Sequence, residues 1–325
     1  MRRPRRTGAQ QSTPGILLGL VIVVGSLGDD ARAQTAPTSP PGLRTEITEQ
    51  KELIANSDED TFQRSREASP VRIEPDYGIV PANHLKFYLT FAQPMERGDV
   101  FRFLRLVRID PDGKEIAEVP DPFREVELWD ETFTRMTLWF HPGRQKPGVN
   151  LNVEIGPILE AGHRYRLLLS GQWRTETGHP LADHPIAFEF DAQAPDNQVP
   201  DPSHWHLQAQ PGTVTLHADD LLDPVSLRTS LTVTTADGGR SFPIDRFVIS
   251  ARPTSERPFL STSIRLLLAG KAWPPGRYRL VLQPKLEDLA GNSLARPFNL
   301  DLEARPHFKE RTEPVKLPFE VPAAD

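Results

Sequence analysis

The side chains best suited to metal chemistry are three aspartates and two histidines in the second half of the chain. Asp219, Asp220 and Asp223 offer the several oxygen ligands that a hard cation such as Ca²⁺ requires, but their spacing matches no calcium loop. His204 and His206 are separated by one residue, so a strand would place both imidazoles on one face, where a third ligand would complete a zinc site. No third ligand follows from the spacing. We therefore expect turn-forming aspartates, a structural strand between domains, and no metal or other cofactor.

Sequence motifs of common enzymes are not present. The chain contains no His-Glu-x-x-His, Gly-x-Ser-x-Gly, phosphate-binding loop or dinucleotide fingerprint. Hydrolysis by paired carboxylates would need two acids at a controlled separation, whereas acids such as Asp110 and Asp112 lie in predicted turns. The sequence thus predicts a protein that is not an enzyme.

The best candidates for recognition lie around one long connection, residues 141–160, which follows a predicted strand at 136–140. A rigid aromatic side chain beside charged loop residues is a typical recognition surface. The alternative is that the aromatic residue caps the core and the charges are solvated. The candidate binding residues are Trp139, His141, Arg144, Lys146 and Glu154.

Short runs of alternating apolar residues, separated by Pro, Gly and Asp, must position these side chains. Such runs are typical of strands with one buried face, and their number favours an all-β sandwich. Short helical turns are expected near 97–103 and 223–229. The predicted strands are 71–74, 85–91, 106–109, 116–119, 136–140, 165–169, 186–190, 214–216, 231–234, 264–268, 278–282 and 298–302, with a further short strand at 315–321.

The order of these elements occurs twice. Val100, in the helical turn expected near 97–103, matches Val225, 125 residues later. The same offset of 125 pairs Leu106 with Leu231 and Gly113 with Gly238. Tyr165 matches Tyr278 at an offset of 113. The difference of 12 residues indicates an insertion in the first repeat, and 141–160 is the best place for it. Insertions lie in surface loops, which often carry binding.

Three motifs carry a resemblance to a known family. The first repeat contains Phe91-Ala92-Gln93-Pro94-Met95, and the second contains Gly276-Arg277-Tyr278 followed by Asp288-Leu289-Ala290-Gly291-Asn292. In this order they resemble the bacterial Ig-like domains of surface-layer and other exported proteins, the SbsA Ig-like group. The first repeat has Thr175-Glu176-Thr177-Gly178 at its turn, and the second has Leu216-His217-Ala218-Asp219-Asp220 in place of the first motif. The resemblance implies two tandem Ig-like β-sandwich domains that act as spacers, adhesion modules or accessory domains.

The N-terminus has the pattern of a signal peptide. Four arginines precede an apolar run at 16–27 and the small-residue pattern Ala31-Arg32-Ala33, so we expect cleavage near Ala33. The run is about a dozen residues, short of the roughly 20 that span a bilayer, and we expect no transmembrane segment in the mature chain. An uncleaved anchor is the alternative. The chain has no cysteine, which excludes lipoprotein anchoring and disulfides.

Charge and compartment narrow the class of partner. Without residues 1–33 the chain keeps 33 basic and 42 acidic residues, a net charge of −9, which argues against nucleic acid. We expect a periplasmic or extracellular, cell-surface protein whose partner is an envelope protein or a cell-surface polymer.

The sequence divides into six parts with one predicted role for the whole. We predict a non-enzymatic Ig-like binding or scaffolding protein that recognises a protein partner through the inserted loop. The alternative is a glycan-binding or accessory module of a carbohydrate-active system. The parts are a signal peptide (1–33), a flexible N-terminal tether (34–70), Ig-like domain 1 with its inserted loop (71–193), a Pro-rich linker (194–203), Ig-like domain 2 (204–304) and a C-terminal tail (305–325).

Overall fold

A computed structural model gives the arrangement of the chain from residue 69 onward. The described residues belong to one compact unit, Thr61–Asp325. The predicted signal peptide and nearly all of the predicted tether lie outside the described residues. The structure describes residues 69–323, apart from 146–147, 149, 243, 245, 255–256, 269–271 and 300–306.

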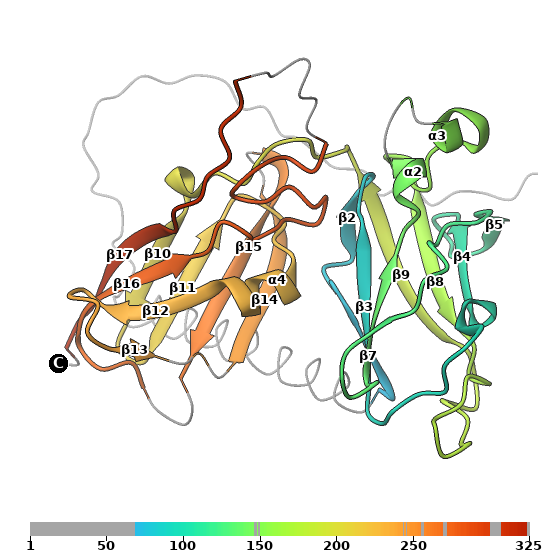
Figure 1. The fold of residues 1–325 in the computed structure, drawn as a ribbon, viewed down its shortest axis with the longest axis horizontal. Coiled ribbons are helices and arrows are strands. Elements are labelled where there is room, and N and C mark those ends of the chain that lie inside the picture. The colour runs from blue at the N-terminus through green and yellow to red at the C-terminus, as the bar shows by residue number, and fades with distance from the viewer. Residues whose placement is uncertain are drawn as a thin grey trace, which may run out of the picture. The chain divides into compact units, whose positions relative to one another are not determined.

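The first module, residues 69–193, consists of two β-sheets (Figure 1). One has the strand order β1-β3-β7-β6 and the other β2-β9-β8-β4-β5. Strands dominate the described residues and helices are few among them, which confirms the all-β prediction. The elements are β1 (Val71–Glu74), β2 (Ile79–Pro81), β3 (Lys86–Phe91), η1 (Val100–Phe103), β4 (Leu104–Ile109), β5 (Glu115–Glu118), β6 (Leu128–Trp129), β7 (Arg135–Trp139), α2 (Pro142–Gln145), α3 (Asn150–Ile155), β8 (Arg164–Leu169) and β9 (Ile186–Gln193).

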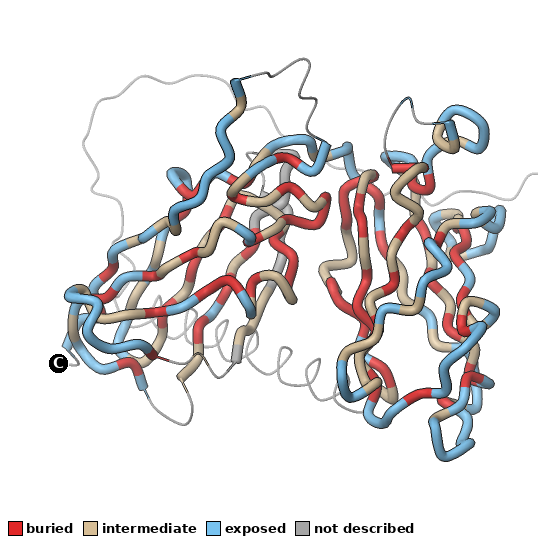
Figure 2. The backbone as a smooth tube through the Cα atoms, viewed as in Figure 1, coloured by how far each residue is buried: buried red, intermediate tan, exposed pale blue. Residues whose placement is uncertain are grey.

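Alternate residues of both sheets form the core of this module. Phe87 on β3 is fully buried and packs against Phe140 from its own side of the module and Phe190 from the other sheet. Figure 2 shows buried and less buried positions alternating along strands such as β7 and β8. Each fully buried large apolar side chain contributes about 1.5–3 kcal/mol, so this alternation holds the two sheets together without disulfides.

The second module, residues 202–323, repeats the two-sheet plan. Its sheets have the orders β10-β11-β15-β14 and β13-β12-β16-β17. A separate core lies between them, with Trp273 and Tyr278 in edge-to-face contact. The elements are η2 (Pro202–His204), β10 (His206–Gln210), β11 (Thr213–Ala218), α4 (Pro224–Ser230), β12 (Leu231–Thr235), β13 (Ser241–Phe242), β14 (Arg246–Thr254), β15 (Arg257–Leu267), β16 (Gly276–Leu282) and β17 (Val315–Val321).

The two modules pair their strands at equivalent positions. These pairings show that one part of the predicted alignment between the repeats is wrong. Tyr165 and Tyr278 occupy equivalent places, opposite Arg108 on β4 and Thr235 on β12. The crossing turns align two residues away from the predicted match. The fully buried counterpart of Val100 is Leu227, because each lies four residues before the strand that follows it. Val225 is only partly buried.

The strand predicted at 298–302 is not formed where the structure describes it. Phe298 lies outside any strand and donates its backbone N–H to Asn292 Oδ1 at 3.1 Å, which keeps it beside the preceding turn. Residues 300–306 lie outside the described residues. Instead, β17 pairs with β16 along its whole length, from Gly276 opposite Val321 to Leu282 opposite Val315. The short strand predicted at 315–321 is confirmed.

The turn at 288–292 fastens the second module to the first. Leu85 donates its backbone N–H to the carbonyl of Leu289 at 3.1 Å, and His84 Nδ1 lies 3.0 Å from the same oxygen. Because a carbonyl can only accept, Nδ1 carries the proton. Leu289 is part of the first module's core cluster. The predicted linker also binds both sides, since Asp196 O accepts from Asn83 and Asn292.

A buried ionic network continues the junction between β3 and α4. Asp223 is 1% exposed and caps α4 through the backbone N–H groups of residues 225 and 226. Tyr88 Oη donates to its Oδ2 at 2.9 Å, and Lys86 Nζ lies 3.7 Å away while contacting Glu287 at 2.6 Å. Because the buried carboxylate has a cation and several donors, its charge is compensated.

Candidate functional site

The inserted loop begins beside Trp139 and His141, which the structure places at the end of β7 and just after it. Trp139 is half-buried, and the guanidinium of Arg124 lies over its ring, 5.7 Å from the centroid. His141 is also half-buried and its Nδ1 accepts from the backbone N–H of Gly143 at 3.2 Å. Both residues therefore shape the start of the loop, and neither offers an open face.

Arg144 has a different place from the one expected of a binding residue. It is 2% exposed, and its guanidinium donates to backbone carbonyls of two segments, 120–121 and 156–157. Nε and Nη2 donate to Gly156 and Pro157 at 3.0 Å each, and Nη1 donates to Pro120 and to Asp121. Burial lowers the pKa of Arg144 from its ordinary value. Because all of its nitrogens are used inside the chain, Arg144 is a structural clamp that a partner does not reach.

Gln145 is a second clamp, which no sequence pattern singled out. It is 8% exposed and donates from Nε2 to the backbone carbonyl of His84 at 2.6 Å. His84 in turn contacts Leu289 of the second module. Burial lowers the pKa of His84 to about 3, so its ring is neutral at physiological pH. The inserted loop thus supports the junction as well as its own module.

The tip of the inserted loop is the exposed part. On α3, Val153 is 71% exposed and Ile155 is 42% exposed, and Glu154 between them is exposed. Large apolar side chains this exposed on one short turn are the part of the loop most suited to contact. Lys146, the remaining candidate binding residue, lies outside the described residues.

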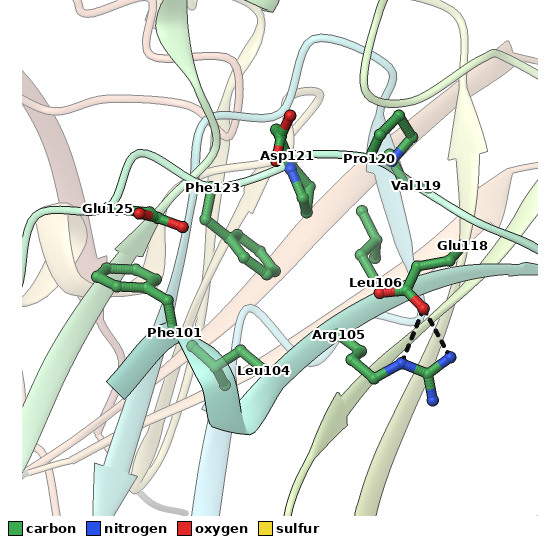
Figure 3. Close-up of a pocket in the computed structure, with 11 residues that line it drawn as sticks. Phe101, Leu104, Arg105, Leu106, Glu118, Val119, Pro120, Asp121, Phe123 and Glu125 are labelled. Carbon is green, nitrogen blue, oxygen red and sulfur yellow. Dashed lines mark hydrogen bonds and ion pairs between the residues drawn. The ribbon is translucent and has the colours of Figure 1, made fainter. Parts of the chain in front are cut away.

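The segment that Arg144 clamps forms one wall of an open groove of about 390 Å³. The opposite wall comes from η1 and β4, and Figure 3 shows the side chains of both walls. His141 N–H donates to Pro122 O at 2.9 Å, and Phe123 stacks on Phe140 with a 10° interplanar angle. The inserted loop therefore holds this wall in place from behind.

Apolar rings and acidic groups line the groove together. Phe101, Leu104 and Phe123 give it apolar surface, and Asp121 and Glu125 are exposed on the clamped wall. The groove was missed in the sequence. Its signal was the break of alternation at Pro120-Asp121-Pro122, where the chain must leave the sheet.

The aspartates and histidines first considered for metals serve other contacts. Asp219 and Asp220 both accept from Trp205 Nε1, at 3.1 and 3.0 Å, while Asp223 caps α4. His204 lies 3.4 Å from Asp219. In the part of the chain that the structure describes, no group of three His, Asp or Glu side chains could hold a metal ion.

His206 does not share a site with His204. Its ring stacks on His217 with centroids 4.7 Å apart, and His217 Nδ1 lies 3.0 Å from Ser263 Oγ. Burial and the neighbouring His206 lower the pKa of His217. The predicted strand between domains is only half formed, because His204 ends η2 and His206 begins β10.

Comparison with known proteins gives no family for this chain, so its function is argued from the geometry. No protein-family model matches the sequence, and no curated protein matches it. Among the described helices, none is long and apolar enough to cross a membrane.

Proposed function

We propose that this chain is an exported, non-enzymatic binding or scaffolding protein of the bacterial envelope, built on two tandem Ig-like β-sandwich modules. The observation that carries the proposal is the division of the inserted loop. Its base is fixed by the buried Arg144 and Gln145, whereas its tip on α3 exposes Val153 and Ile155. A rigid base beneath an exposed apolar tip favours binding, because little ordering is needed when a partner docks.

Export is supported by the arginines, apolar run and small-residue pattern before Gln34. The two-sheet plan, its repetition and the motifs shared with the SbsA Ig-like group support the Ig-like assignment. The mature chain is then a periplasmic or cell-surface protein, with an envelope protein as its partner.

The glycan-binding alternative is less well supported. A sugar platform needs an open aromatic face with polar groups in reach. The ring of Trp139 has Arg124 over it, and its indole nitrogen is buried. Trp139 therefore favours protein recognition at the neighbouring loop tip over a sugar platform of its own.

The test is capture of a partner from envelope extract by the mature protein and by Val153→Asp/Ile155→Asp. We expect the variant to lose most of the captured protein, because both changes place a charge in the contact. Ile116→Asp/Leu128→Asp is the matched control, since it adds the same charge at positions that are 57% and 37% exposed on β5 and β6, outside the inserted loop. Equal capture by all three proteins would overturn the assignment to the loop tip. Arg144 is left intact because its removal would also disturb the wall at 120–121.

A further inference from the structure

The groove contains a strand edge that is partly unpaired. On one side, β8 pairs with β4 over all of 104–109. On the other, β5 pairs with β4 only over 107–109, and the last backbone bond runs from Val119 N–H to Leu106 O at 2.9 Å. The chain then leaves the sheet at Pro120. Among the described strands, none pairs with residues 104–106 on the groove side.

An unpaired edge of this kind is a template for an added strand. Backbone N–H and C=O groups at a sheet edge bind an extended segment through ladder hydrogen bonds, and pockets beside the edge select its side chains. The ladder register directs the backbone groups of Leu104 and Leu106 toward the groove, because Phe103 O accepts from Ser170 of the opposite side. Leu104 N–H donates to Phe101 O and Leu106 O accepts from Val119, so Leu104 O and Leu106 N–H are the two groups left for an added strand. The groove thus supplies both a backbone edge and a pocket.

The pocket beside this edge fits an apolar side chain. Phe101 and Phe123 border it, and Leu104 and Leu106 lie along its β4 wall (Figure 3). Of these, Phe101 is the most exposed. Leu104, Leu106 and Phe123 are at most 6% exposed, so an added side chain would remove mainly the surface of Phe101 from water, at about 25 cal/mol per Å².

Charge indicates what flanks that apolar residue. Arg105 on β4 is paired with Glu118 at 2.9 Å, so these two charges offset each other. Asp121 and Glu125 make no ion pair with another described residue, and both are exposed on the clamped wall. The buried Arg144 guanidinium interacts with Asp121 from behind the wall, so the two carboxylates still leave an excess of negative charge. A segment with Lys or Arg beside its apolar residue complements this excess.

We infer that the groove between β4 and residues 119–125 binds an extended, basic segment of the partner protein, which pairs with Leu104 O and Leu106 N–H on the edge of β4. The inference rests on the proposed binding function and gives the chemistry of its partner. A second copy of this chain is a poor occupant, because the chain is acidic overall and would bring like charge to an acidic rim.

The test uses the mature protein as bait for a displayed library of random 12-residue peptides. We expect enriched peptides to carry Lys or Arg on both sides of an apolar residue. Synthetic copies should bind Asp121→Lys/Glu125→Lys at least about tenfold more weakly, because two attractive charges become repulsive. Asp112→Lys/Glu131→Lys is the matched control, since it changes the same net charge at exposed positions away from the groove.

Three results would overturn the inference: no enrichment, enrichment of acidic or uncharged peptides, or equal weakening by both double variants. These results are distinguishable from failure of the proposed function, which is measured by envelope capture with the α3 variant. If that variant loses the partner while the library yields no groove-dependent peptide, the binding function stands and the groove assignment falls. Groove-dependent peptides with no partner captured from the extract would support the groove assignment and overturn the recognition of an envelope protein by the loop tip.

Discussion

The turns at 175–179 and 288–292 have the same backbone frame and opposite surroundings. In each, the first residue donates its N–H to the fifth, at 2.8 Å in the first module and 2.9 Å in the second. The fourth residue is glycine with a φ of 84° in one and 81° in the other. Most of the first turn is exposed, whereas Asp288 and Asn292 in the second are at most 2% exposed.

The side chain at the first position of each turn makes as many hydrogen bonds to the turn as the burial of that turn requires. Thr175 Oγ1 accepts one backbone N–H, from His179 at 3.1 Å. Asp288 accepts three donors, from the backbone of Ala290 and Asn292 and from Asn292 Nδ2, at 2.8 to 2.9 Å. A carboxyl group can be buried when its oxygens are satisfied in this way, whereas water supplies the partners of the exposed turn.

One local backbone design can therefore either close a module or dock it against another. A Cβ added to Gly291 would lie 2.2 Å from Leu85 Cδ1 of the first module, whereas one added to Gly178 would meet nothing within 4 Å. The backbone conformation needs glycine at both sites, but only the second site also needs the space. The second turn is thus a structural contact between modules.

The largest expected difference comes from the glycines. Gly291→Ala should lower the free energy of unfolding by about 4 kcal/mol, through left-handed backbone strain and overpacking against Leu85. Gly178→Ala has the strain alone and should cost about 1 kcal/mol. Urea unfolding of both variants measures the difference. Equal losses would show that residue 291 does not approach Leu85 so closely.

The aspartate gives the next largest effect. Asp288→Ala leaves buried donors without an acceptor and should lower the free energy of unfolding by about 3 kcal/mol. Thr175→Ala should cost less than about 1 kcal/mol, because water replaces the hydroxyl. Thermal unfolding, followed by circular dichroism, compares the two. Similar shifts in Tm would contradict the assignment of different roles to the two turns.

The smallest effect is a pH dependence of stability, which we expect from the buried acidic groups around the second turn and not around the first. Burial raises the pKa of Asp288 well above its usual range, with the charge of Asp196 adding to it, and burial raises the pKa of neighbouring Asp220 to about 7. Asp196 and Asp219 also face this cluster. The folded protein binds the Asp220 proton more tightly than the unfolded chain does, so protonated Asp220 contributes to the free energy of unfolding. This contribution is full below about pH 4 and is lost as pH rises through about 7.

Asp220→Asn removes this group while its amide oxygen still accepts from Trp205. Asp220 is only partly buried, so we expect stability between pH 5 and pH 8 to change by about 2 kcal/mol less in the variant. Asp112→Asn, at an exposed position, is the control and should keep the wild-type dependence. An unchanged pH dependence in Asp220→Asn would show that this carboxyl group does not titrate in that range. Urea midpoints at the two pH values measure it.

The sequence revealed the local part of the fold. Alternation located β1, β3 and β8, and the positive φ of Gly178 and Gly291 is a conformation that glycine adopts readily in a turn. These features depend on neighbours within a few residues. The pairing of β17 with β16 joins residues 276–282 to residues 315–321, and no local pattern specifies a contact between such distant segments.

The sequence indicated a surface loop at 141–160 but not the contacts of its side chains. The extra length at 141–160 and the exposed position of Glu154 agree with a surface loop. The burial of Arg144 was hidden, because charged loop residues are usually solvated and its carbonyl partners carry no sequence signal. The groove was hidden for the same reason, since its walls come from segments that meet only in three dimensions.

We infer that the first module recognises the partner while the buried turn at 288–292 docks the second module against the first. Amide hydrogen exchange of the mature protein, alone and with the partner captured from envelope extract, tests this most directly. We predict slower exchange at residues 104–106 and 150–157 in the complex, with no change at 175–179. Slower exchange confined to the second module, with the first module unchanged, would contradict the account.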